Sequence, residues 1–413
     1  MNLTKKRWVI LVAACMINLC LGSVYAWSVF ASSMADYLSV RNGITLTTGD
    51  LAIVYTVANA VGPITMISGG FFNDKYGPKK VILTGGVMFG VGMVLSGFAT
   101  SVGFLIVTYG LLCGLGIGMT YGSTISSSVK FFPDKRGLIG GITTAVYGFS
   151  SVILPPVITM IVEKSDATFA FKSIGAVFLM IIVGCSFLME QCPEGFVPDG
   201  WEPPVQASGV SKANDKDWKG MLRSPEFYVM IALLLCGAFC GMMIIPHASA
   251  IAGNMVGLAT MMASTAVSVL ALFNAAGRVA AGTLSDKIGR INTLCLACVL
   301  SVAGMLCLYL TGEGDTMLFF VGIAIVGVCF GSFMGVFPGF TADQFGVKNN
   351  SVNYGIMFIG FALAGYFGPT VMTKVSVQDG AYQRAFLIAM GLSIAGVILT
   401  FAYRFLSRRK QAS

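Results

Sequence analysis

Charged side chains are scarce in this 413-residue chain: Asp, Glu, Lys and Arg together make up 11% of it, and histidine occurs once. Soluble domains carry about 25% charged residues, which cover their surface. Hydrophobic residues, in contrast, make up 56% of the chain. The chain therefore lacks the polar surface that a soluble protein of this length needs, and we expect lipid to cover most of its exterior.

Several kinds of site are also missing. None of the eleven cysteines forms a spaced pair in a predicted loop, which argues against a zinc site and a disulfide framework. No Walker-type glycine-rich loop is present, so ATP is not expected to drive the protein. The apolar runs contain neither a nucleophile beside a base nor a metal-spaced group of His, Cys, Asp or Glu. We therefore expect no metal, no cofactor and no enzymatic activity.

Long apolar runs dominate what is present. A membrane-spanning helix needs about 20 predominantly apolar residues. Twelve such runs occur, at 8–30, 50–72, 80–99, 102–127, 138–162, 167–189, 227–253, 259–285, 291–311, 316–342, 352–376 and 381–403. They predict an all-α membrane protein with twelve transmembrane helices. The first run is too long for a signal-peptide core, so we interpret it as a retained helix.

Lysine and arginine are distributed unevenly between the two ends of these runs. With a cytoplasmic N-terminus, 20 of the 26 basic residues fall on the cytoplasmic side, five on the far side and one, Arg278, well inside a run. This is the positive-inside pattern of membrane proteins. It predicts a multi-pass protein of the cell membrane with both termini cytoplasmic. It also accounts for the net charge of +8 without a nucleic-acid partner.

The chain consists of two related halves. Its longest polar segment, 190–226, predicts a cytoplasmic linker between an N-terminal six-helix bundle at 1–189 and a C-terminal six-helix bundle at 227–413. The pattern Gly-x-x-x-Asp-Lys-x-Gly follows both the second and the eighth run, and it places Asp74 and Asp286 at the same point of each half. Repetition in register indicates a duplicated fold.

Two further patterns support the duplication and tight packing. Tyr147 and Phe361 each lie eight residues before a proline, in the fifth and the eleventh run. Glycine recurs at spacing four in the fourth run, which allows transmembrane backbones to touch. These glycines are Gly110, Gly114, Gly118 and Gly122.

The repeated Asp-Lys motif resembles the signature loop of the major facilitator superfamily. The resemblance implies two pseudo-symmetric six-helix bundles with a substrate site near the membrane midplane at their interface. Asp74 and Asp286 would hold a neighbouring helix end or basic residue and release it when the halves rock. The alternative is a plain cytoplasmic turn with solvated charges.

Only two ionisable side chains lie well inside the apolar runs: Arg278 and His247. An arginine at the bilayer centre costs about 2.5–3.5 kcal/mol on insertion scales and normally faces a cavity or a partner. No Asp or Glu is available at the depth of Arg278, so we expect it to hold a substrate carboxylate by two parallel hydrogen bonds. The alternative is an arginine bonded to helix carbonyls and to Asn274, one turn earlier.

Helical rise places further candidates near that depth. At about 1.5 Å per residue, they lie about 9–16 Å from the cytoplasmic ends of their helices. They are Arg278, Asn274, Tyr121, Tyr147, Phe333 and Phe361. His247 falls about 30 Å up, near the height of Tyr25, unless Pro246 kinks or breaks its helix. Each ring can equally be a packing residue, and His247 can either relay a proton or be a polar residue at a wet helix end.

Several stretches resemble the oxalate/formate antiporter family, which is close to the monocarboxylate transporters. They are VYAWSVFA at 24–31, YGSTISSSVKFFPDKRGLIGGITTAVYG at 121–148, MLRSPEFYVM at 221–230 and NYGIMFIGFALAG at 353–365. The resemblance implies that Arg278 binds substrate and that Tyr25, Tyr121 and Tyr147 belong to an aromatic cage. This chain differs from oxalate carriers at one position: they have a lysine there, and this chain has Phe361.

We therefore predict a monomeric secondary transporter for small monocarboxylate anions of the lactate and pyruvate type. The second carboxylate of oxalate would face Phe361, and an unpaired buried ion costs several kcal/mol. The resemblance implies proton symport, although Asn274 replaces the aspartate that animal monocarboxylate transporters have. The alternatives are an oxalate/formate antiporter, a multidrug or neutral-solute carrier that does not need Arg278, and a membrane enzyme or non-transporting receptor.

Overall fold

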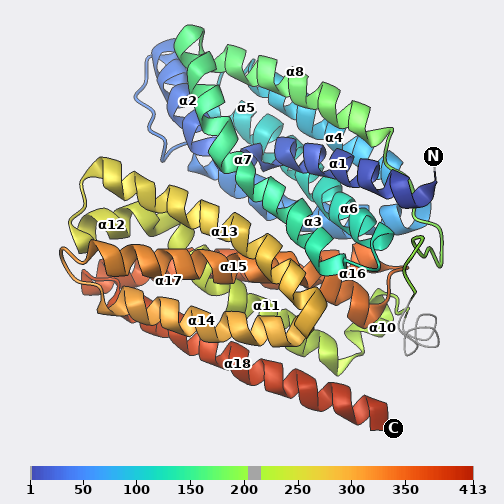
Figure 1. The fold of residues 1–413 in the computed structure, drawn as a ribbon. Helices are drawn as coiled ribbons and strands as arrows, with labels where there is room; N and C mark the ends of the chain where they lie inside the picture. Colours follow the sequence, from blue (N-terminus) through green and yellow to red (C-terminus); the bar gives the residue numbers. More distant parts are fainter. Residues whose placement is uncertain (1, 203–214, 413) are drawn as a thin grey trace. The chain divides into compact units, whose positions relative to one another are not determined.

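The computed structural model describes residues 2–202 and 215–412, and the regular elements in these ranges are helical (Figure 1). Within them, twelve helical stretches are long and apolar enough to cross a membrane. They follow the twelve predicted runs in order along the chain, which confirms the prediction of an all-α protein with twelve transmembrane helices.

The helices of the first half include one 3-10 turn and one π-helical stretch between α-helices. They are α1 (Leu3–Leu21), η1 (Gly22–Ala26), α2 (Trp27–Asn42), α3 (Ala52–Tyr76), α4 (Pro78–Ser96), α5 (Val102–Leu105), η2 (Ile106–Cys113), α6 (Gly114–Phe131), α7 (Arg136–Lys164) and α8 (Ala167–Ser186).

The second half begins with a short helix before its first span. Its elements are α10 (Trp218–Leu222), α11 (Pro225–Ile244), η3 (Ile245–His247), α12 (Ala248–Val256), α13 (Thr260–Ile288), α14 (Arg290–Leu310), α15 (Thr316–Phe345), α16 (Asn350–Met357), α17 (Ile359–Asp379) and α18 (Gln383–Ala412).

Contacts divide the chain into two compact units. Unit 1 is formed by Met1–Asp134, Val146–Asp215 and Gly346–Ile356, and unit 2 by Lys135–Ala145, Lys216–Phe345 and Met357–Ser413. The first turns of α7 thus pack with unit 2, and most of α16 packs with unit 1. The predicted bundle boundaries and the linker at 190–226 stay a prediction, and residues 203–214 of that linker lie outside the described residues.

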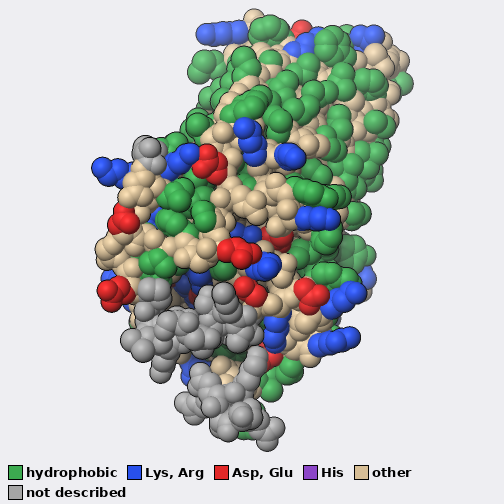
Figure 2. Space-filling model, turned by 90° about the vertical axis from the view of Figure 1, so that its right-hand side faces the viewer, with side chains coloured by type: hydrophobic (Ala, Val, Ile, Leu, Met, Phe, Trp, Pro, Cys, Tyr) green, Lys and Arg blue, Asp and Glu red, His purple; other side chains and the backbone are tan. Residues whose placement is uncertain are grey.

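The surface has the character of a membrane protein. Large apolar side chains are exposed along the spans, among them Ile64 (64%), Met180 (66%) and Ile398 (63%). Figure 2 shows a face on which Lys, Arg, Asp and Glu side chains gather in one region, with hydrophobic side chains over the rest of the surface. Lipid contact along the helices accounts for this distribution.

Glycine stripes bring one pair of helices into backbone contact in each unit. In unit 1, a Cβ on Gly118 of α6 would lie 1.9 Å from the carbonyl oxygen of Gly62 in α3. In unit 2, a Cβ on Gly331 of α15 would lie 2.1 Å from the carbonyl oxygen of Asn274 in α13. The close contact predicted for the fourth run is therefore present, and its counterpart in α15 holds the helix that carries Arg278.

Candidate functional site

The glycines of the repeated motif are explained by the structure. Gly77 and Gly289 end α3 and α13 with φ of 84° and 89°, a conformation that glycine adopts without steric cost. A Cβ on Gly70 would lie 2.7 Å from the carbonyl group of Ser351, and one on Gly282 would lie 2.2 Å from the carbonyl oxygen of Gly137. The motif therefore needs glycine both for its turn and for the close approach of another segment.

Each motif aspartate binds the first turn of a helix. In unit 1, the carboxylate of Asp74 accepts hydrogen bonds from the main-chain amides of Ser351 (3.3 Å) and Val352 (3.0 Å), at the start of α16. Lys130 Nζ lies 2.7 Å from the same carboxylate. Because a helix N-terminus carries unpaired N–H groups and a partial positive charge, it favours an anion at this place.

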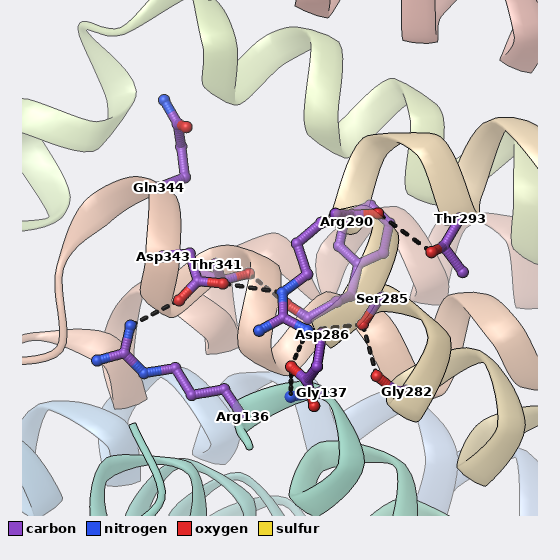
Figure 3. Close-up of polar contacts among 12 residues, drawn as sticks. Arg136, Gly137, Gly282, Ser285, Asp286, Arg290, Thr293, Thr341, Asp343 and Gln344 are labelled. Atoms are coloured by element: carbon purple, nitrogen blue, oxygen red, sulfur yellow. Dashed lines mark hydrogen bonds and ion pairs between the residues drawn. The ribbon is translucent and has the colours of Figure 1, made fainter. Parts of the chain in front are cut away.

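The same arrangement recurs in unit 2 with more charges (Figure 3). The carboxylate of Asp286 accepts from the amides of Gly137 and Leu138, both at 2.9 Å, at the start of α7. Arg290 pairs with Asp286 at 2.6 Å and with Asp343 at 2.8 Å, and Arg136 pairs with Asp343 at 2.6 Å. Two arginines and two aspartates thus alternate here.

In unit 1 the Asp74–Lys130 ion pair is accompanied by neutral side chains and not by a second ion pair among the described residues. Asn73 Nδ2 donates to Ser351 Oγ at 2.6 Å, and that hydroxyl donates to Ser126 Oγ at 2.8 Å. Asn73 and Ser351 are buried. Sequence reasoning found the two aspartates but missed their partners, because backbone amides carry no sequence signal and Lys130, Arg136 and Asp343 come from distant helix ends.

Arg278 is buried in unit 2, with 2% of its surface exposed. Its Nε donates to Asn274 Oδ1 at 3.1 Å, and Nη1 donates to the main-chain carbonyl of Thr144 in α7 at 2.6 Å. These are the partners that the alternative interpretation of Arg278 named. Within residues 2–202 and 215–412, Arg278 takes part in no ion pair. The charge is therefore hydrogen-bonded but has no carboxylate beside it in this part of the chain.

His247 lies at an interruption of the seventh span. The 3-10 turn η3 separates α11 from α12, so the break that the sequence suggested at Pro246 is present. His247 Nδ1 lies 3.2 Å from the carbonyl oxygen of Met243, and Nε2 lies 3.2 Å from Thr373 Oγ1. Since a carbonyl only accepts, Nδ1 carries a proton, and Nε2 of the neutral ring accepts from the threonine. These contacts do not include Arg278.

The two predicted phenylalanines of unit 2 lie in aromatic surroundings. The ring of Phe361 stacks on Phe358 at 4.5 Å between centroids and lies 6.2 Å from Phe330. Phe333 is fully buried, and a Cβ on Gly237 would lie 2.1 Å from its ring. Phe333 thus has the contacts of a packing residue, whereas Phe361 is only partly buried.

The three predicted tyrosines lie together in unit 1. The ring of Tyr147 lies 4.6 Å from that of Tyr121 and 5.4 Å from that of Tyr25. Tyr25 belongs to the 3-10 turn η1 and is 37% exposed, whereas the other two are buried. A Cβ on Gly22 of η1 would lie 2.2 Å from the carbonyl oxygen of Tyr147 in α7. Close packing of η1 against α7 therefore holds the three tyrosines together.

The units divide the candidate residues between them. Tyr25, Tyr121 and Tyr147 belong to unit 1, and Arg278, Asn274, His247, Phe333 and Phe361 belong to unit 2. Of the latter, the structure brings Arg278 and Asn274 into contact. A single pocket formed by all eight stays a prediction. In the described parts of the chain, no three His, Cys, Asp or Glu side chains are grouped so that they could hold a metal ion.

Comparison with known proteins identifies the family. The model of the Major Facilitator Superfamily matches residues 13–369. The chain belongs to this superfamily. It is 30% identical to the oxalate:formate antiporter of Oxalobacter formigenes over 411 residues, which cover 97% of this chain and 92% of the antiporter. It is 23% identical to monocarboxylate transporter 12 of Xenopus laevis, over 98% and 90% of the two chains.

Other relatives agree with this membership. An uncharacterised transporter of the superfamily, YhjX of Escherichia coli K12, is 29% identical over 88% of this chain and 86% of its own. Two solved structures share the fold. The proton:xylose symporter XylE has a TM-score of 0.72 at 13% identity, with 96% of each chain covered, and FucP in the outward conformation has 0.67 at 14%, with 94% and 98% covered. The protein is a multi-pass membrane transporter of this superfamily.

Proposed function

We propose that this transporter carries small monocarboxylates of the lactate and pyruvate type by proton symport, and that Arg278 binds their carboxylate. The observation that carries the proposal is the buried guanidinium of Arg278, which has hydrogen bonds but no ion pair among the described residues. A buried charge needs compensation. A substrate carboxylate can supply it through two parallel hydrogen bonds.

The names of two relatives support an organic anion as substrate. One is called an oxalate:formate antiporter and the other a monocarboxylate transporter. Phe361 favours a monocarboxylate as substrate. With Arg278 as the cation, one carboxylate is neutralised, whereas a second would meet the apolar rings of Phe361 and Phe358 and remain uncompensated. Exchange of oxalate and formate is the second candidate, and the 30% identity to the Oxalobacter antiporter favours it.

The remaining candidate residues have proposed roles of different kinds. Tyr25, Tyr121 and Tyr147 would offer hydroxyl groups and ring faces to the organic part of the anion. Asn274 orients Arg278. For His247, whose Nε2 accepts a hydrogen bond in the neutral ring, protonation would replace that acceptor by a donor, which makes it a candidate for the proton path.

Asp74 and Asp286 would release the helix ends that they hold during the transport cycle. We further propose a monomer in the cell membrane with both termini in the cytoplasm, as the distribution of basic residues suggests. No role for nucleic acid or for enzymatic chemistry is proposed.

Uptake into liposomes tests the substrate and the role of Arg278 together. Wild-type protein, Arg278→Lys and Arg384→Lys are reconstituted, and uptake of radiolabelled lactate, pyruvate, formate and oxalate is measured with and without an inward proton gradient. We expect the gradient to raise lactate and pyruvate uptake by wild type. Because lysine keeps the charge but loses the two-pronged hydrogen bond, Arg278→Lys should raise KM by about tenfold or more.

Arg384→Lys is the matched control, since Arg384 is an exposed residue that pairs with Asp379 at 3.2 Å. It should transport as wild type does. If Arg278→Lys is equally silent, Arg278 does not clamp a carboxylate. If oxalate exchanges with formate without any effect of the proton gradient, the antiporter is the correct function.

A further inference from the structure

Three lysines of unit 1 lie where α3 ends and α4 begins. Lys75 lies in the last turn of α3, and Lys79 and Lys80 lie in the first turn of α4. All three are exposed. None of them takes part in an ion pair with any residue that the structure describes. Three positive charges therefore gather at one turn, and none of them has a described carboxylate within ion-pair distance.

Exposed aromatic rings accompany these lysines. Lys75 Nζ lies 5.2 Å from the ring centroid of Tyr76, and Lys79 Nζ lies 4.8 Å from that of Phe187, which follows α8. The rings of Phe72 and Tyr76 stack at 6.1 Å with an angle of 19°. A ring face attracts an ammonium group without neutralising its charge.

These rings are exposed on the surface of unit 1. Phe72, Tyr76 and Phe187 are 47%, 51% and 56% exposed. We call the group formed by Phe72, Lys75, Tyr76, Lys79, Lys80 and Phe187 the lysine–aromatic surface.

The equivalent turn of unit 2 has a different composition. Arg290 follows Gly289 there, and its charge is met by Asp286 and Asp343. Asn292 stands at the place of Lys80 and accepts a hydrogen bond from Arg404 at 2.8 Å. No aromatic residue occurs between 281 and 292. Lys287, at the place of Lys75, is exposed and has no ion pair among the described residues, but it is the one lysine between 281 and 292. Because the duplicated fold forms this turn with a single lysine and without rings, the lysine–aromatic surface is not a requirement of the fold.

We propose that the lysine–aromatic surface is a binding site for an anionic phospholipid. Both flanking helices, Ala52–Tyr76 and Pro78–Ser96, are membrane spans, so the three ammonium groups lie at the level of the lipid headgroups. Exposed aromatic rings are typical of that level, and clustered lysines beside a span attract acidic lipids.

The chemistry of the lysine–aromatic surface matches both parts of such a lipid. The phosphate diester pairs with Lys75, Lys79 and Lys80, and the upper acyl chain lies on Phe72, Tyr76 and Phe187. A free phosphate would use the charges but leave the rings without a partner. The proposal does not depend on which substrate is carried.

Lipid selectivity of the reconstituted full-length protein tests the proposal. Delipidated protein is placed in bilayers of phosphatidylcholine with phosphatidylglycerol as the minor component, and its preference for spin-labelled phosphatidylglycerol over spin-labelled phosphatidylcholine is measured. We expect wild type to prefer phosphatidylglycerol. The triple variant Lys75→Gln/Lys79→Gln/Lys80→Gln should lose about tenfold or more of that preference.

The matched control removes the same charge elsewhere: Lys5→Gln/Lys135→Gln/Lys287→Gln changes three exposed lysines that have no ion pair among the described residues. It should keep the preference of wild type. If both triple variants lose the preference for phosphatidylglycerol equally, net charge explains it and the proposal is overturned. A wild type that shows no such preference would overturn it as well. If the first triple variant does not fold, Lys75→Arg/Lys79→Arg/Lys80→Arg is compared with wild type. Both proteins should prefer phosphatidylglycerol, and the absence of that preference in either would overturn the proposal.

Discussion

Arg278 Nη1 donates a 2.6 Å hydrogen bond to the main-chain carbonyl of Thr144. Thr144 lies in the part of α7 that packs with unit 2, although α7 belongs to the first half of the sequence. A carbonyl oxygen satisfies a donor of the guanidinium but supplies no full negative charge. We therefore expect a substrate carboxylate to compete with this carbonyl for Nη1.

Replacing Asn274 by aspartate tests whether the charge of Arg278 is available. The amide oxygen of Asn274 already accepts from Nε at 3.1 Å, so a carboxylate of the same shape would pair with Arg278. This internal anion would compete with the substrate, and we expect Asn274→Asp to raise KM for lactate or pyruvate by about tenfold or more. Uptake kinetics in liposomes measure it. Asn42→Asp, at an exposed helix end, is the control, and an unchanged KM in Asn274→Asp would separate Arg278 from substrate binding.

Gly331→Ala tests the packing that positions Arg278. The added Cβ would lie 2.1 Å from the carbonyl oxygen of Asn274 and 2.9 Å from the amide nitrogen of Arg278. Both are backbone atoms, so α13 and α15 must move apart, and overpacking of this kind costs about 1–3 kcal/mol. Thermal unfolding in detergent should show a lower midpoint and transport should fall. Gly391→Ala, where a Cβ meets nothing within 4 Å, should leave both unchanged; equal behaviour of the two variants would contradict the prediction.

Hydropathy predicted most spans closely. The run 167–189 corresponds to a span at Ala167–Ser186, and 316–342 to Thr316–Phe345. The first span is the exception: the run 8–30 is continued by α2 as far as Asn42. Asp36 and Arg41 lie in that extension, and hydropathy treats charged residues as loop although the helix continues through them.

For the buried charge of Arg278, the sequence predicted the hydrogen-bond partner that lies on the same helix but not the one on another helix. Helix periodicity places Asn274 beside Arg278, and the structure has that bond. The carbonyl of Thr144 could not be predicted, because every residue carries one and only the packing of α7 selects it. Arg7 and Glu226 are 7% and 3% exposed, respectively, although both lie just outside the predicted apolar runs. Arg7 owes its burial to Asp134, 2.7 Å away.

Tyr147→Phe separates a binding hydroxyl from a packing ring. The ring lies 4.6 Å and 5.4 Å from those of Tyr121 and Tyr25, and phenylalanine keeps these contacts. We expect the unfolding midpoint to stay at the wild-type value and KM to rise severalfold. Tyr147→Ala, which removes the ring, should in addition lose about 3–5 kcal/mol of stability. A silent Tyr147→Phe with a destabilised Tyr147→Ala would mark Tyr147 as a packing residue.

Asp286→Asn tests the hydrogen bonds that hold the first turn of α7 within unit 2. The carboxylate accepts two amide hydrogen bonds at 2.9 Å and pairs with Arg290 at 2.6 Å. Asparagine keeps one acceptor but turns an NH2 group toward donors and removes the charge, so we expect a loss of about 1–3 kcal/mol in the free energy of unfolding. Thermal unfolding measures it. Asp36→Asn, at an exposed position, is the control, and an Asp286→Asn variant as stable as this control would contradict the prediction.

Phe361→Lys tests why the anion should carry one carboxylate. Phe361 is partly buried beside Phe358 and Phe330, and a lysine there would add a second cation to that of Arg278. Because a dianion would then be compensated at both ends, we expect oxalate uptake to rise by about tenfold or more relative to lactate uptake. Phe361→Met keeps the site apolar and should bring no gain. Competition of unlabelled oxalate with labelled lactate measures the change, and a wild type that already takes up oxalate as readily as lactate would show that Phe361 does not exclude dianions.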